Sequence, residues 1–172
     1  MLFRLTAKAK EQLSIFKLEK HISTPEKEFF FEWNIDVAFI NHKKYFIITE
    51  GKTLFTVIKH AKGIKNIQEF EIFIGEIFTN LFNELVEGVN LKQLNLHNCI
   101  YASTENNNVR ISQIDHLYHA KHLVEKGINT FEINRIPIAS IGYQFPVDYF
   151  IKELGKILER DGFVYIEDVL RN

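Results

Sequence analysis

The chain of 172 residues contains little that would support a disulfide or a boundary between domains. It has one cysteine, Cys99, together with three prolines and eight glycines. A lone cysteine excludes an intramolecular disulfide and a multi-cysteine metal site, and it favours a reducing compartment. No Ser/Gly-rich linker and no internal repeat interrupts the sequence. These features predict one domain that spans residues 1–172.

The chain also lacks an excess of charge and a long apolar run. Its 21 basic and 22 acidic side chains give a net charge of -1, so only a local basic patch can attract a nucleic acid or an anionic membrane. No stretch approaches the roughly 18 apolar residues of a membrane span. The first residues become charged too soon for a signal peptide. We therefore expect a cytoplasmic protein.

Familiar catalytic motifs are missing from the sequence. It contains no Gly-rich phosphate loop, no Gly-x-Ser-x-Gly elbow, no His-Glu-x-x-His pair and no dinucleotide fingerprint. Cys99 lies in an apolar run, which is typical of a buried, inert thiol. We expect a protein-binding or ligand-binding module without catalytic activity or cofactor. Sixteen phenylalanines favour an exposed aromatic patch, and with it a protein partner or a homodimer.

The clearest pattern that is present covers residues 29–50. Apolar and polar residues alternate from Phe29 to Phe39, which is typical of a strand with one buried face. A turn at 41–44 predicts an antiparallel hairpin in which Phe39 lies opposite Phe46. A second reversal at Glu50 and Gly51, with glycine supplying a positive φ, predicts a third strand over 53–58. A short helix over the same residues is the alternative, because apolar residues also recur there at helical spacing.

Amphipathic helices are predicted on both sides of this segment in the sequence. A strand over 2–5 precedes a helix that Thr6 caps, and Asn66 with Glu69 forms a capping box at the start of a helix over 67–87. A short strand over 99–102 and a helix capped by Ser112 follow. The last helix covers 147–160 behind Pro146. The predicted fold is α+β, with an antiparallel sheet centred on the 29–50 hairpin and packed against these helices.

Several of these segments together resemble a known family. The opening MLFRLTAKA, the continuation KYFIITEGKTLFTVI, the acidic and aromatic helix, and the late stretch STENNNVRISQID are similar to a family of small, uncharacterised bacterial domains of unknown function. The resemblance implies a bacterial or phage source and a compact α+β domain. It brings no activity and no site residues.

A metal site is the first candidate site. On the helix after Ser112, Asp115, His119 and His122 fall within one narrow arc, beside Tyr118. One carboxylate and two imidazoles are suitable ligands for a divalent metal, so this arc predicts a metal-dependent enzyme as an alternative function. The simpler interpretation is a solvated helix face, with Asp115 placed favourably near the helix N-terminus.

Polar loops give a second candidate site. Asn107 and Arg110 follow a run of asparagines, and Asn134 and Arg135 lie in an expected irregular loop over 131–145. Amide and guanidinium groups can hold a carboxylate, a phosphate or a base edge. Asparagine is equally common in ordinary turns, so turn chemistry is the alternative explanation.

Lysines form the third candidate, a nucleic-acid surface. Lys43 and Lys44 lie at the hairpin tip, and Lys62 and Lys65 lie in a basic loop that Lys59 precedes. Tyr45 and Phe55 are interleaved with them. Such a surface predicts weak, salt-sensitive binding, provided that the tip and the loop are neighbours. The alternative is that these lysines serve only solubility.

Overall fold

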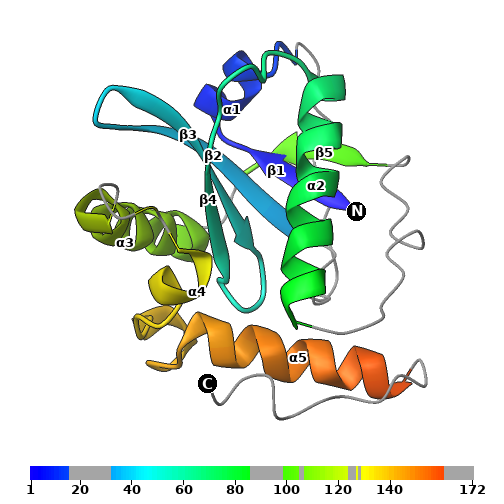
Figure 1. Cartoon of the computed structure of the whole chain (residues 1–172), viewed down its shortest axis with the longest axis vertical. Helices are drawn as coiled ribbons and strands as arrows, with labels where there is room; N and C mark the ends of the chain where they lie inside the picture. The colour runs from blue at the N-terminus through cyan, green and yellow to red at the C-terminus, as the bar shows by residue number, and fades with distance from the viewer. Residues whose placement is uncertain (16–31, 86–98, 105–106, 124–126, 128, 161–172) are drawn as a thin grey trace.

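The computed structural model describes residues 1–15, 32–85, 99–104, 107–123, 127 and 129–160. These residues form a five-stranded sheet with helices on both faces (Figure 1). The elements are β1 (Leu2–Leu5), α1 (Ala7–Gln12), β2 (Glu32–Ile40), β3 (Lys43–Glu50), β4 (Thr56–His60), α2 (Ile67–Leu85), β5 (Ile100–Ser103), α3 (Asn107–Leu123), α4 (Thr130–Ile133), a 3-10 helix (Ala139–Ile141) and α5 (Pro146–Arg160). The strand order is β4-β3-β2-β1-β5.

The α+β class is confirmed, but the sheet is mixed and not purely antiparallel. β2, β3 and β4 form the antiparallel part. β1 lies between β2 and β5 and runs parallel to both, so that Phe3 is level with Trp33 and Tyr101. Alternation within a segment shows which side chains share a face, but it does not show the direction of a partner that is distant in sequence. The prediction therefore failed at β1.

The central hairpin has a different register from the predicted one. Val37 lies opposite Phe46 and Phe39 lies opposite Lys44, a shift of two residues. The reason is the turn, which contains only Asn41 and His42, at φ 47° and 62°. Two successive positive φ values define the tight hairpin turn that suits the twist of the strands. A shift of two residues preserves the faces, so the buried face is the predicted one. Phe39 itself, however, is 63% exposed.

The connection from β3 to β4 is a reversal, as predicted, and β4 is a strand and not a helix. The positive φ belongs to Leu54, at 61°, and not to Gly51. Gly51 is needed for close approach, because a Cβ there would lie 3.2 Å from the carbonyl oxygen of Glu32. The Gly51 amide donates a hydrogen bond to that oxygen at 2.8 Å. The glycine therefore lets the reversal pack on the start of β2.

An aromatic core fills one face of the sheet, beneath α1, α2 and α5. The centre of the Trp33 ring lies 4.7 Å from the centre of the Phe78 ring on α2 and 6.3 Å from the centre of the Phe150 ring on α5. Both predicted covering helices are present. The predicted cap by Asn66 is confirmed, since its Oδ1 accepts from the Glu69 amide at 3.0 Å. The Glu69 carboxylate accepts from the Lys65 amide at 2.7 Å, one residue before the amide that a capping box would use. Burial of these large side chains stabilises the fold by roughly 1.5–3 kcal/mol each.

The opposite face of the sheet is covered by α3 and α4 and is more polar (Figure 1). Helix α3 begins at Asn107, five positions earlier than its predicted cap, Ser112. Ser112 is fully buried inside the helix and its hydroxyl contacts His116 Nδ1 at 3.2 Å. A serine within a helix can bond one turn away in this manner, so its presence alone did not mark a helix start. The predicted irregular loop over 131–145 contains most of α4 and a 3-10 helix.

Some predictions lie outside the described residues. They are the exposed connection that the charged segment 17–28 predicts, the helix stop that Gly88 predicts, the last strand that residues 163–166 predict, the first residues of the hairpin, 29–31, and Asn106 in the run of asparagines.

Candidate functional site

The hairpin tip and the basic loop are neighbours in the structure. β3 pairs with β4, so that Tyr45 lies opposite His60. One step beyond this pair, the Ala61 amide donates to the carbonyl oxygen of Lys44 at 2.8 Å. This bond fixes the start of the 61–65 loop against the base of the hairpin tip. We call the surface formed by Lys43, Lys44, Lys62 and Lys65 the hairpin-end surface.

Gln12 at the end of α1 and Ser14 just after it form hydrogen bonds with both parts of this surface. Gln12 accepts a hydrogen bond from Lys44 Nζ and donates one to the carbonyl oxygen of Ile64. The Ser14 hydroxyl donates to the carbonyl oxygen of Lys65 at 3.3 Å. One side chain therefore joins the two basic segments, and a second holds the end of the loop. The loop is anchored at three positions along its length, which reduces the conformational entropy that ligand binding would have to remove.

Positive charge is concentrated in the part of the chain that contains the hairpin and the 61–65 loop. Residues 37–68 include six lysines and one acidic residue, Glu50, whereas the rest of the chain has 15 basic and 21 acidic residues. Glu50 is fully buried. Within the described residues, no carboxylate forms an ion pair with the four lysines of the hairpin-end surface. The near-neutral total charge thus conceals a local positive region of the kind that attracts polyanions.

Aromatic rings accompany these lysines. Phe39 is 63% exposed, and Lys44 Nζ lies 5.7 Å from the centre of its ring. On the other face of the hairpin, the rings of Tyr45 and His60 are 5.2 Å apart. Phe39 therefore offers a flat apolar face beside an ammonium group. Phe55, which the sequence grouped with the lysines, is instead fully buried against Phe150.

Lys59 does not belong to the hairpin-end surface. It lies opposite Phe46, on the same face of the sheet as Lys44 but two residue positions further from the hairpin tip. Its side chain lines a pocket with residues of α2 and of the α4 region. The predicted basic set therefore divides into two sites with different neighbours.

The predicted metal arc lies on α3. Asp115 and His122 are exposed and His119 is half-buried. The Tyr118 ring packs edge-on against both imidazoles, and its centre lies 5.5 Å from the centre of the His119 ring and 5.3 Å from that of the His122 ring. In the described part of the chain, no group of three His, Cys, Asp or Glu side chains is placed to hold a metal ion.

The four polar-loop candidates have different roles. Asn107 and Arg110 are exposed on the first turns of α3, and Arg135 is exposed after α4. Asn134 is fully buried. Its Oδ1 accepts from the Thr56 amide and its Nδ2 donates to the carbonyl oxygens of Thr56 and Thr130, each at 2.7 Å. Asn134 therefore extends the edge of β4 as a backbone partner would, and it fixes α4 to the sheet.

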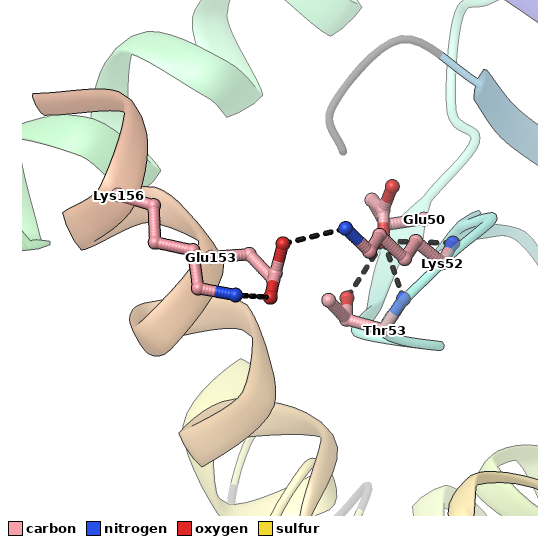
Figure 2. A network of polar contacts seen from close by, with 5 residues as sticks. All are labelled: Glu50, Lys52, Thr53, Glu153 and Lys156. Carbon is pink, nitrogen blue, oxygen red and sulfur yellow. Dashed lines mark hydrogen bonds and ion pairs between the residues drawn. The ribbon is translucent and has the colours of Figure 1, made fainter. Parts of the chain in front are cut away.

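A charged network joins α5 to the β3–β4 connection (Figure 2). The Glu153 carboxylate receives Lys52 Nζ at 2.6 Å on one oxygen and Lys156 Nζ at 2.5 Å on the other. Burial alone would raise the pKa of Glu153, but the hydrogen bonds from Lys156 and Lys52 outweigh it and lower the pKa. Nearby, Glu50 Oε2 accepts from the amides of Lys52 and Thr53 and from the Thr53 hydroxyl. These contacts hold the reversal and the helix together.

A buried polar layer beneath α3 was missed by the sequence interpretation. Gln113 Nε2 donates to the carbonyl oxygen of Asn34 at 3.1 Å, and His116 is fully buried one turn further along. Burial lowers the pKa of His116 to about 4, although hydrogen bonding with Ser112 acts in the opposite direction. The available signal was helical spacing, because Val109, Ser112, His116 and Ala120 recur every three to four residues on one face. The predicted metal arc lies on an adjacent face, roughly 100° around the helix.

Cys99 is half-buried just before β5. Burial raises the pKa of its thiol, which keeps the sulfur protonated and weakly nucleophilic at neutral pH. The sequence predicted a buried thiol, whereas Cys99 is half-buried.

No helix among the described residues is long and apolar enough to cross a membrane. No curated protein shows significant similarity to the chain. A family model described as "Domain of unknown function (DUF6933)" matches residues 2–149, from β1 to the first turn of α5. This match includes the hairpin, the 61–65 loop and α1, which together build the hairpin-end surface. Because it covers most of the chain, the protein belongs to this family of domains of unknown function.

Proposed function

We propose that this protein is a binding module that holds single-stranded nucleic acid on its hairpin-end surface, weakly and without strong sequence preference. The observation that carries the proposal is the hydrogen bond from the Ala61 amide to the Lys44 carbonyl oxygen. It makes Lys43 and Lys44 neighbours of the loop that contains Lys62 and Lys65. The proposal includes a cytoplasmic location, which suits a chain with a single cysteine.

Single-stranded polymers fit this surface better than duplexes. Ammonium groups neutralise phosphates and release counterions, which supplies affinity without reading sequence. Phe39 adds an exposed ring next to Lys44 Nζ. An unpaired base can stack on such a ring, a contact worth about 1–3 kcal/mol, whereas a base inside a duplex is already stacked.

The test is fluorescence anisotropy of a labelled oligothymidylate and of a labelled single-stranded RNA at about 50 mM salt, where counterion release favours binding. The variant K43E/K44E/K62E/K65E should lose binding to both polymers. The matched control R110E/K121E/R135E/K152E makes the same change in total charge at exposed positions on α3, after α4 and on α5, and it should retain binding. Circular dichroism melts verify that both variants fold.

Two results would contradict the proposal. One is that the parent protein binds neither polymer at low salt. The other is that the control variant loses as much affinity as the hairpin-end variant, because binding would then follow total charge and not this surface. The variant Phe39→Ala tests stacking separately: it should weaken binding by about tenfold and leave the salt dependence unchanged.

A further inference from the structure

A pocket of about 240 Å³ lies between β4, α2 and the start of α4. Val57 and Lys59 lie on the same face of β4, two residues apart. On α2, Ile77, Asn80, Leu81 and Glu84 recur every three to four residues, so they form one face of the helix. Asn129, Thr130 and Phe131 line the third side. None of the four lysines of the hairpin-end surface lines this pocket.

The lining combines an apolar floor with two opposite charges. Ile77 and Leu81 are buried, whereas Lys59 and Glu84 are exposed at the pocket. Within the described residues, no ion pair joins the Lys59 ammonium and the Glu84 carboxylate to each other or to any other side chain. One anionic and one cationic ligand group can therefore be bound at the same time.

We infer that this pocket binds a free amino acid with an apolar side chain. Lys59 pairs with the ligand carboxylate and Glu84 with the ligand ammonium, while the Asn80 amide can hydrogen-bond to either group. The apolar side chain lies on Ile77, Leu81 and Phe131. The volume agrees with this ligand, because it is below the roughly 300–1,000 Å³ that accommodate drug-sized molecules. Asn129 and Thr130 also line the pocket, so polar groups that can orient a ligand outnumber the apolar ones.

The experiment is a titration of ¹⁵N-labelled protein, followed by NMR, with three compounds that share one apolar body. L-Leucine carries both charged groups, leucinamide lacks the carboxylate and 4-methylpentanoate lacks the ammonium. Leucine should shift the amide resonances of Lys59, Asn80 and Glu84. The other two compounds should bind at least about tenfold more weakly, since each loses one hydrogen-bonded charge.

Variants assign each charge to its partner. Lys59→Gln should make leucine and leucinamide bind alike, and Glu84→Gln should make leucine and 4-methylpentanoate bind alike. Asn80→Trp, at an exposed position on the pocket rim, should block all three compounds. Lys121→Gln, at an exposed position on α3 outside both the pocket and the hairpin-end surface, is the matched control and should leave leucine binding unchanged. None of the three pocket variants should alter nucleic-acid binding, which separates this inference from the proposed function.

The inference is overturned if leucine moves none of the pocket resonances at millimolar concentration, or if the three compounds bind the parent protein equally. It is also overturned if Lys59→Gln and Lys121→Gln reduce leucine affinity by the same factor.

Discussion

The buried imidazole of His116 predicts that the fold loses stability in mild acid. Its pKa is about 4 in the folded chain because burial disfavours the charged ring, whereas an exposed histidine has a pKa of about 6.5. Below pH 6.5 the unfolded chain therefore binds a proton that the folded chain does not bind. Stability falls from pH 6.5 towards pH 4 and then levels off. The whole shift corresponds to about 3.4 kcal/mol, and about 2 kcal/mol of it is lost between pH 7 and pH 5.

Urea unfolding at pH 7, 6 and 5 measures this effect. The window isolates His116 from the α5 network, because the lowered pKa of Glu153 keeps its contribution intact until the pH falls below about 4.5. His116→Gln removes the titrating group, so its free energy of unfolding should change little between pH 7 and pH 5. His119→Gln, on the same helix but half-buried, is the matched control and should retain the loss. A parent protein equally stable at pH 7 and pH 5 would refute the reasoning.

Three further predictions concern the fold. Phe78→Asp should destabilise it by more than about 4 kcal/mol, because a carboxylate would be buried beside Trp33; an unchanged melting temperature would place the wrong helix face in the core. Asn134→Ala should cost about 2–4 kcal/mol in calorimetry, because the amide and the carbonyl of Thr56 lose their partner; a loss below about 0.5 kcal/mol would remove its structural role. His42→Gly should raise the urea midpoint by an amount equivalent to about 0.5–1 kcal/mol, because glycine adopts a positive φ without strain; a lower midpoint would contradict the turn geometry.

Local patterns in the sequence predicted most of the elements. The alternation before Asn41 and the cap at Asn66 each depend on residues within one turn or one strand. The direction of β1 and the two-residue register shift were missed. The direction of β1 depends on which strands it pairs with, and the register depends on the backbone angles of the turn at Asn41 and His42. Hydrophobic periodicity contains neither kind of information.

The candidate site was predicted in part for the same reason. The lysines were identified individually, but their convergence depends on the bond between Ala61 and Lys44 and on the bridge through Gln12. The assignment of Lys59 to a different site depends on its position further along the sheet, where it lines a pocket with residues of α2. His116 lies outside the arc of Asp115, and its burial is seen only in the structure.

A titration of ¹⁵N-labelled protein with an unlabelled single-stranded oligonucleotide tests the central claim most directly. At about 50 mM salt, the amide resonances of residues 39–45 and 60–66 should shift together, and those of α3 should stay in place. Raising the salt should weaken binding with a slope of log K against log salt of about -3, as expected when four lysines contact a single strand. Shifts centred on α3, or binding that does not respond to salt, would contradict the account.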